Sequence, residues 1–239
     1  NKYLRYQIDV ELIKKMIRSK ILSVDRRSKY ILLKLNNSYT IIIHLGMTGK
    51  IIISDSKNNK RRSSFYFNLY DDKPLHNHVI FQFNNDVKII YNDVRKFGFI
   101  KVEKTKKLLQ NSHFKKLGPE PLSKKFDSKY FINFTKKRKI GLKDLLMSQN
   151  FVAGLGNIYV NEAIFLSKIN PRIKAYKISN KKIIDLIKNI KKLLKKAIEE
   201  GGSSIRDFNN ADGQEGNFQQ YFNVYGRKGE LCRRVKCKG

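Results

Sequence analysis

The chain has 239 residues, 41% of them hydrophobic, which is enough for one large domain or two modest domains with real cores. No apolar run approaches the roughly 20 residues of a membrane span and the start does not resemble a signal peptide, so we expect a cytoplasmic protein. The net charge of +31, from 51 Lys and Arg against 20 Asp and Glu, indicates a polyanionic partner, although a merely solvated basic surface stays open.

Residues 21–102 contain short β-type runs separated by turn residues, which predicts an antiparallel β-sandwich. The stretch at 117–122, LGPEPL, continues neither a strand nor a helix and predicts a domain boundary. The β-type runs are 30–33, 40–43, 50–53, 65–67, 78–81, 87–90 and 99–100.

Beyond this boundary the apolar period becomes helical, most clearly after Ser179. Gly201 and Gly202 predict the end of that helix. The remainder is rich in loop residues, with a hairpin expected at 222–227. The residues expected on the apolar face of the helix are Ile183, Ile187, Ile190, Leu194, Ala197 and Ile198.

The segment 151–163, FVAGLGNIYVNEA, combines a glycine turn with a helix start. Gly154 and Gly156 allow a tight turn, and Asn157 stands where the helix begins. Backbone amides at such a helix start form a natural phosphate site. The alternative is a turn whose glycines serve packing alone.

Five motifs in chain order resemble those of the formamidopyrimidine-DNA glycosylase family, over essentially the whole chain. They are HLGMTG at 44–49, DVRKFG at 93–98, GLGNIYVNE at 154–162, GGSSIRDF at 201–208, and FQQ with VYGR within 218–227. The resemblance implies an α+β multidomain protein with an N-terminal antiparallel β-sandwich over 1–116, a helix-two-turn-helix domain over 117–228 and the first half of a C-terminal zinc finger over 229–239.

The same resemblance implies a base-excision-repair enzyme. Such an enzyme removes oxidised purines, 8-oxoguanine and formamidopyrimidines, from duplex DNA by base flipping and Schiff-base chemistry, and its lyase activity then cuts the abasic strand. Its partner is double-stranded DNA containing oxidised purines or abasic sites. We expect a monomeric, bacterial, nucleoid-associated protein.

Base flipping leaves a hole in the DNA stack that the enzyme must fill. Met47 is unbranched and polarisable, Phe97 is a flat apolar wedge, and Arg95 offers a fork of donors to the orphaned base. By resemblance these three residues fill the void, with Arg95 facing the estranged cytosine. The alternative for Met47 and Phe97 is an ordinary core position near a strand end.

The resemblance also assigns the DNA-binding residues. Lys29 matches a lysine of the catalytic site that binds the phosphates around the lesion, and Lys143 matches a lysine near the lesion pocket or is a solvated helix residue. Phosphate contacts are implied for His44, Asn157, Tyr225 and Arg227, and a lesion-binding loop for Gly202, Ser203, Ser204, Ile205 and Arg206.

Both ends of the chain depart from the family pattern. The family nucleophile is an N-terminal proline amine followed by a glutamate, whereas this chain begins at Asn1, so we expect a fragment that is inactive by itself. Cys232 and Cys237 suit a metal site better than a disulfide, and by resemblance they are half the ligands of one structural zinc ion.

Two alternative functions stay open. Endonuclease VIII shares the fold and the N-terminal chemistry but removes oxidised pyrimidines and differs in its void-filling residues. A non-catalytic DNA-binding relative that has lost the proline is the second alternative.

Overall fold

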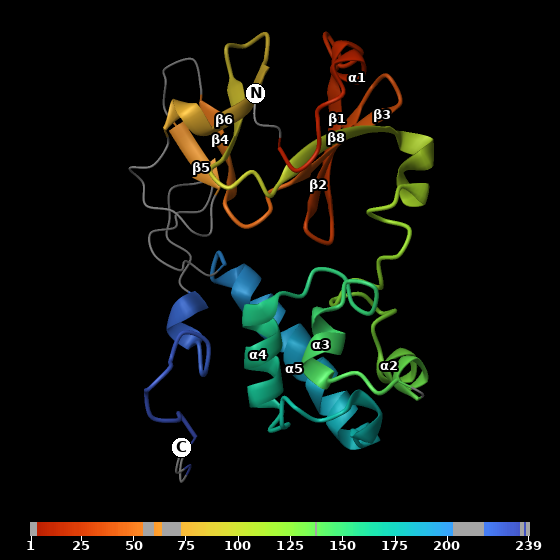
Figure 1. Cartoon of the computed structure of the whole chain (residues 1–239), viewed down its shortest axis with the longest axis vertical. Coiled ribbons are helices and arrows are strands. Elements are labelled where there is room, and N and C mark those ends of the chain that lie inside the picture. Colours follow the sequence, from red (N-terminus) through yellow and green to blue (C-terminus); the bar gives the residue numbers. More distant parts are fainter. Residues whose placement is uncertain are drawn as a thin grey trace. The chain divides into compact units, whose positions relative to one another are not determined.

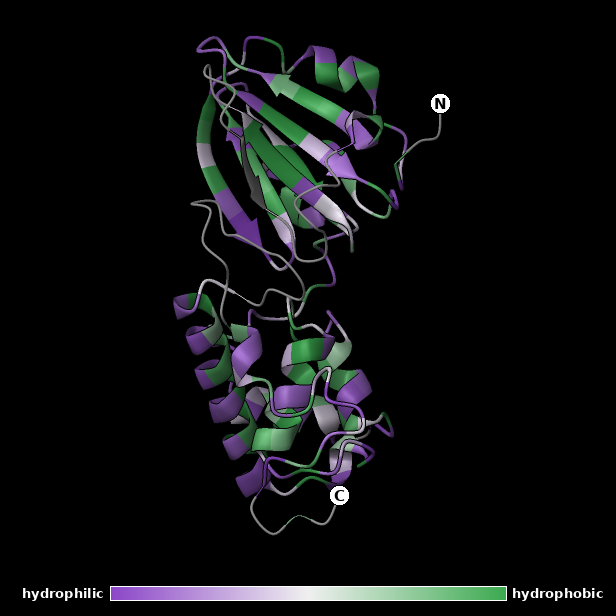
Figure 2. Cartoon of the chain, turned by 90° about the vertical axis from the view of Figure 1, so that its left-hand side faces the viewer, coloured by the Kyte–Doolittle hydropathy of each residue, from purple (hydrophilic) through white to green (hydrophobic). Residues whose placement is uncertain are grey.

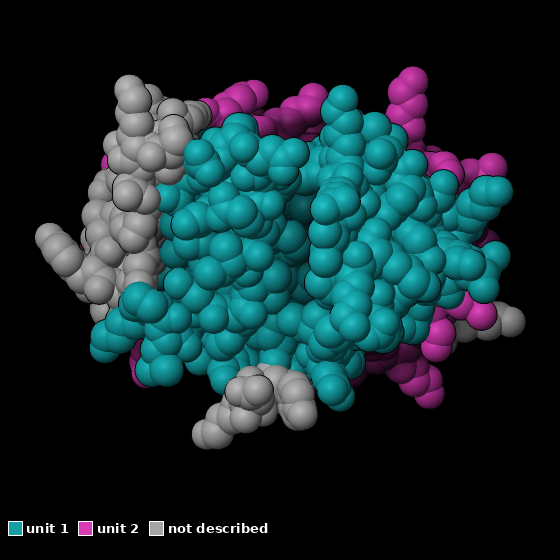
Figure 3. Space-filling model, turned by 90° about the horizontal axis from the view of Figure 1, so that it is seen from above, with its two compact units in different colours: residues 1–114, 200–219 teal, residues 115–199, 220–239 magenta. Residues whose placement is uncertain are grey.

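The structure is a computed structural model that describes residues 4–54, 60–63, 73–136, 138–202, 218–234 and 237. Its contacts divide the chain into two units, coloured separately in Figure 3. Unit 1 comprises residues 1–114 and 200–219, and unit 2 comprises residues 115–199 and 220–239. The domain limits expected from the sequence, after residues 116 and 228, stay predictions.

Two four-stranded antiparallel sheets form the body of unit 1 (Figure 1). Apolar side chains of both sheets, including Ile41, Ile43, Tyr91 and Ile100, meet in one core cluster, so the predicted β-sandwich is confirmed. The first sheet has the order β1 (Ile21–Arg27), β2 (Tyr30–Leu35), β3 (Tyr39–His44) and β8 (Phe99–Lys104); the second has the order β5 (Lys60–Ser63), β4 (Gly49–Ser54), β7 (Lys88–Asp93) and β6 (Asn77–Gln82).

Several elements of unit 1 were not expected from periodicity. The edge strands β1 and β5 carry charged residues, and the run at 65–67 lies outside the described residues. The helix α1 (Val10–Lys14) is one turn long and starts where the Asp9 carboxylate accepts a hydrogen bond from the Leu12 amide at 3.0 Å. Unit 1 also contains the short 3-10 helices η1 (Pro74–His76) and η2 (Thr105–Gln110).

The described part of unit 2 contains four α-helices: α2 (Ser128–Thr135), α3 (Leu142–Met147), α4 (Asn157–Leu166) and α5 (Asn180–Glu199). Two short 3-10 helices also occur in the C-terminal half of the chain, η3 (Ala175–Lys177) and η4 (Phe218–Tyr221). The helix α4 packs against both α3 and α5. No helix within the described ranges is long and apolar enough to cross a membrane.

The long helix α5 follows most of its predicted pattern. Its buried residues include Ile183, Ile187, Ile190 and Ala197, and Figure 2 shows hydrophilic residues along one side of the long helix. Leu194, expected on the apolar face, is half-buried, and Ile198 in the last turn is 68% exposed. Gly201, with φ +71°, follows the helix end as predicted.

The hairpin expected at 222–227 is wrong. These residues form turns and bends without strands. The amides of Asn223, Val224 and Tyr225 donate to the carboxylate of Glu162 on α4, so they are not available for a strand ladder.

Candidate nucleic-acid interface

Two turns at one end of the sandwich place Met47 and Phe97 at the surface. A side chain at Gly46, whose φ is +64°, would put its Cβ only 2.6 Å from the Gly98 nitrogen, so the two turns pack backbone against backbone. Met47 is nevertheless 52% exposed and Phe97 is 47% exposed. The core alternative for these two side chains is therefore wrong.

Arg95 lies on the same turn as Phe97. Its guanidinium carbon is 4.5 Å from the centre of the Phe97 ring, which is a cation–π distance. The turn therefore presents an apolar ring and a planar set of hydrogen-bond donors side by side at the surface.

Lys29 and His44 lie close together in unit 1. Lys29 is at the tip of the hairpin between β1 and β2, and the next residue, Tyr30, pairs with His44 across β2 and β3. The Lys29 side chain reaches the surface, yet enough protein surrounds its ammonium for burial to lower its pKa.

His44 is a neutral hydrogen-bond donor at neutral pH. Burial, followed by the positive charges of Lys29 and Arg5 and by His113, lowers its pKa to about 4. Nδ1 accepts a hydrogen bond from the Gly46 amide at 3.1 Å, so the single proton of the ring belongs on Nε2. That N–H is suited to a phosphate oxygen.

A stack of rings supports His44 from within unit 1. The ring centre of Phe99 is 5.4 Å from that of His44 and 4.6 Å from that of His113. The ammonium of Lys101 lies 3.2 Å from Nε2 of His113, and burial together with Lys101 and Arg5 lowers the pKa of His113. Neutral histidines among three cationic side chains indicate a site prepared for anions.

In unit 2, the helix α4 begins at Asn157 as predicted, and the Asn157 side chain is exposed. The preceding glycine turn is held by Gln149, which sequence reasoning missed. Its Oε1 accepts from the Gly154 amide at 2.7 Å, and its Nε2 donates to the Leu155 carbonyl at 3.0 Å. Lys143, on α3, is half-buried.

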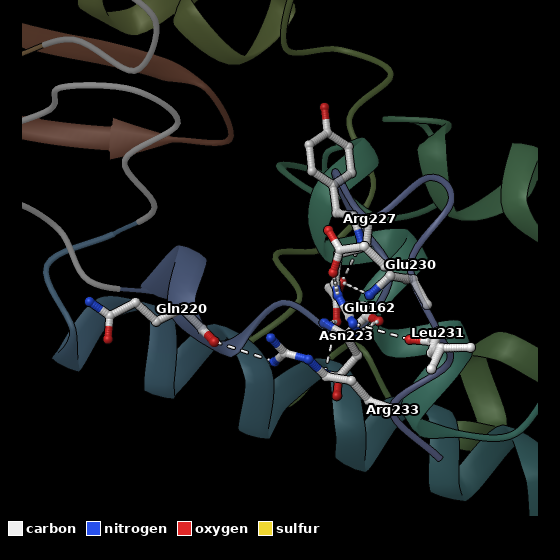
Figure 4. Close-up of polar contacts among 9 residues, drawn as sticks. Glu162, Gln220, Asn223, Arg227, Glu230, Leu231 and Arg233 are labelled. Atoms are coloured by element: carbon white, nitrogen blue, oxygen red, sulfur yellow. Dashed lines mark hydrogen bonds and ion pairs between the residues drawn. The ribbon is translucent and has the colours of Figure 1, made fainter. Parts of the chain in front are cut away.

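Glu162 is the second residue that sequence reasoning missed. It is fully buried on α4, and its two carboxylate oxygens accept the amides of Asn223, Val224 and Tyr225 and the Asn223 side-chain amide, at 2.8–3.0 Å (Figure 4). A glutamate within the mostly apolar run IYVNEAIFL was the available signal, because a buried charge needs partners.

Arg227 fixes the other side of the same loop. Its Nε donates to Glu230 at 2.7 Å, and its two terminal nitrogens donate at 3.1 Å to the carbonyls of Asn223 and Leu231 (Figure 4). Tyr225 is half-buried against Phe222, with ring centres 5.7 Å apart. The loop therefore presents Tyr225 from a fixed backbone.

The remaining predicted residues are only partly described. Gly202 has φ +98° and its carbonyl accepts the Phe218 amide at 3.0 Å, whereas Ser203, Ser204, Ile205 and Arg206 lie outside the described residues. Cys232 is half-buried, Cys237 is exposed, and they are not joined in a disulfide. Within the described part of the chain, no group of three or more potential metal ligands occurs.

Models of two domains of one family match this chain. The formamidopyrimidine-DNA glycosylase N-terminal domain matches residues 1–100, and the H2TH domain of the same family matches residues 117–209. The formamidopyrimidine-DNA glycosylase of Caulobacter vibrioides is 40% identical over 237 residues, which covers 99% of this chain and 82% of that protein. This chain belongs to the formamidopyrimidine-DNA glycosylase family.

Other relatives agree with this family. The formamidopyrimidine-DNA glycosylase of Ruegeria sp. is 38% identical over 236 residues, again covering 99% of this chain and 82% of the relative. The Lactococcus lactis Fpg in complex with DNA containing an abasic site has a TM-score of 0.81 and 34% identity, covering 95% of this chain and 78% of that one. A complex of the same protein with Fapy-dG-containing DNA has a TM-score of 0.80. The predicted resemblance is confirmed.

Proposed function

We propose that this protein excises oxidised purines, 8-oxoguanine and formamidopyrimidines, from duplex DNA and then cuts the abasic strand. The observation that carries the proposal is the exposure of Met47 and Phe97 on two adjoining turns, with Arg95 over the Phe97 ring. Family membership supplies the class of reaction, a DNA glycosylase with abasic-site lyase activity.

The void-filling role follows from the cost of flipping a base. Extruding a nucleotide costs a few kcal/mol, and an apolar group inserted into the stack recovers part of that cost. Exposed Met47 and Phe97 gain from leaving water when they enter the stack. Arg95 can only donate hydrogen bonds, so it suits the acceptor O2 of the estranged cytosine.

We assign contacts with the phosphates around the lesion to residues of both units. In unit 1, Lys29 supplies a positive charge and His44 supplies the Nε2 proton. In unit 2, Asn157 and Tyr225 supply neutral donors. Arg227 uses three of its five N–H groups within its own loop, which leaves two for a phosphate.

The lesion loop and the nucleophile belong to the same proposal. Residues 202–206 contribute small residues and backbone amides to the edge of the flipped purine. By family resemblance the nucleophile is an N-terminal proline amine, whose pKa of about 8 keeps part of it neutral and able to form a Schiff base with the sugar. The other residues in this proposal bind and orient the DNA.

We also propose that Cys232 and Cys237 contribute two ligands to a structural zinc ion. Thiolates are favoured zinc ligands, but a closed tetrahedral site takes four ligands, so this pair fits half of the set. Zinc would stabilise the segment that follows the Glu162-bound loop and would take no part in the chemistry.

The alternatives are less well supported. An endonuclease VIII-type activity on oxidised pyrimidines lacks a specific observation in its favour, whereas the similar Lactococcus lactis structure contains Fapy-dG DNA. A non-catalytic DNA-binding protein would have no need for the exposed apolar side chains of Met47 and Phe97.

Borohydride trapping tests the proposed reaction. A protein that carries the family's N-terminal proline ahead of this sequence, incubated with 8-oxoguanine duplex and reductant, should form a covalent adduct that is absent with undamaged duplex. A chain that starts at Asn1 should give none. No adduct in the first case would contradict the glycosylase and lyase proposal, and an adduct in the second would contradict the proline assignment.

A further inference from the structure

The carboxylate of Asp93 lies between the two turns that carry the proposed wedge residues. Asp93 is the last residue of β7, is fully buried, and pairs in register with Gly49, the first residue of β4 after the Met47 turn. The turn that carries Arg95 and Phe97 begins directly after it. A buried carboxylate at this position is costly unless donors satisfy it.

The two oxygens of Asp93 divide their donors between the two turns. Oδ1 accepts the hydroxyl of Thr48, from the Met47 turn, and the amide of Arg95 at 3.3 Å. The Arg95 amide also lies 3.2 Å from the Thr48 hydroxyl, which closes a triangle between the turns.

Oδ2 accepts the amide of Gly98 at 2.9 Å and lies 3.3 Å from the hydroxyl of Tyr91. The same hydroxyl lies 3.2 Å from the carbonyl of His44, where the Met47 turn starts. The backbone carbonyl of Asp93 meets Nε2 of His78 at 2.8 Å, so the main chain of Asp93 is fixed as well.

Met47 is 52% exposed and Phe97 is 47% exposed, so these two side chains contribute little packing that could hold the turns, although Leu45 packs against the core cluster. The polar contacts of Asp93 join the two turns directly. Gly98 makes this arrangement possible, because a Cβ there would collide with the Tyr91 hydroxyl and the His44 carbonyl.

We propose that Asp93 is a positioning residue that couples the Met47 turn to the Arg95–Phe97 turn, so that both enter the vacated base stack as one preformed unit. This inference rests on the proposed void-filling function. It assigns Asp93 no contact with DNA; its effect passes through Thr48, Arg95 and Gly98.

The test measures base unstacking by fluorescence. The protein is mixed with a duplex in which a tetrahydrofuran abasic analogue lies opposite 2-aminopurine, and the fluorescence of the 2-aminopurine rises when this base leaves the stack. Asp93→Asn keeps the shape but replaces one acceptor oxygen with a donor, so one turn loses its partner. Losing one hydrogen bond to a charged acceptor should shift the inserted population by about tenfold, seen as a smaller rise at saturating protein.

Two further variants make the result specific. Glu162→Gln alters a buried carboxylate in unit 2 and should leave the saturating rise at the wild-type value, even where binding weakens. Thr48→Val removes one link between the turns and should reduce the rise less than Asp93→Asn does. It also keeps the test decisive if Asp93→Asn does not fold.

Phe97→Ala separates failure of this inference from failure of the proposed function. If Phe97→Ala abolishes the rise while folded Asp93→Asn and Thr48→Val retain it, the positioning role is overturned and the proposed function stands. If Glu162→Gln reduces the saturating rise as much as Asp93→Asn does, the effect is only one of stability and the inference is again overturned. If Phe97→Ala has no effect, both fall.

Discussion

Asp93 in unit 1 and Glu162 in unit 2 are both fully buried carboxylates that hold functional loops, but they are brought to these loops in different ways. Asp93 binds the turn that directly follows it and the turn paired with it across β4 and β7. Glu162 binds amides about 60 residues further along the chain. The comparison shows that strand pairing between β4 and β7 brings the Met47 turn to Asp93, 45 residues along the chain from Thr48, whereas no strand pairing brings the Tyr225 loop to Glu162.

The largest expected effect is the loss of stability when the contact between Glu162 and the Tyr225 loop is removed. Glu162→Ala leaves three backbone amides and one side-chain amide without their acceptor, so the free energy of unfolding should fall by about 3–5 kcal/mol. Chemical denaturation measures this loss. Glu230→Ala, which removes a half-exposed partner of Arg227, should cost under about 1 kcal/mol, and equal losses in the two variants would contradict the assigned role of Glu162.

The salt dependence of DNA affinity tests the phosphate contacts proposed for unit 1. If several phosphates are neutralised, affinity for abasic-site duplex should fall by about two orders of magnitude or more between 50 and 200 mM salt. Lys29→Met should reduce the slope of log affinity against log salt by about 1, whereas Lys14→Met, which removes an exposed partner of Glu11, should not. An affinity that stays flat across this range would exclude phosphate-based binding.

The pH dependence of the free energy of unfolding tests whether unit 1 holds His44 in its neutral form. The folded-state pKa of His44 is about 4, below its ordinary value of 6.5, so protonation favours the unfolded chain. The free energy of unfolding should therefore fall as the pH decreases from 6.5 towards 4, by about 2 kcal/mol after allowance for solvent screening.

Denaturation at several pH values checks this prediction. His44→Gln should flatten the curve between pH 6.5 and pH 4, and His113→Gln should flatten it less in the same direction. A His44→Gln protein that keeps the full wild-type slope would show that the imidazole is not held neutral by its surroundings.

Local patterns predicted much of this molecule. Short β-type runs separated by turn residues predicted the β-sandwich, and the glycine turn before Asn157 predicted the start of α4. Exposed Met47 lies on the turn that its flanking glycines indicated. In each case the deciding interaction joins residues close in the sequence or follows a regular period.

Contacts between a side chain and distant or irregular backbone were harder to predict from the amino-acid sequence. The partners of Glu162 and Gln149 are backbone groups, which any residue type supplies, so the sequence does not reveal which segment they bind. The hairpin expected at 222–227 was wrong for the same reason, because Glu162 takes the amides that a ladder would use. We also did not predict β1 from the sequence, because charged residues interrupt its β-type run.

The most direct test of the central claim, that Met47, Arg95 and Phe97 fill the space left by the flipped base, is the opposite-base preference of Arg95→Ala. In a protein that carries the family's N-terminal proline ahead of this sequence, excision rates of 8-oxoguanine opposite cytosine and opposite adenine are compared between Arg95→Ala and the unsubstituted protein. Base discrimination of this kind is worth about 1–3 kcal/mol, so the gap between the two rates should shrink by about tenfold or more. An unchanged preference in a folded variant that retains its DNA affinity would contradict the claim.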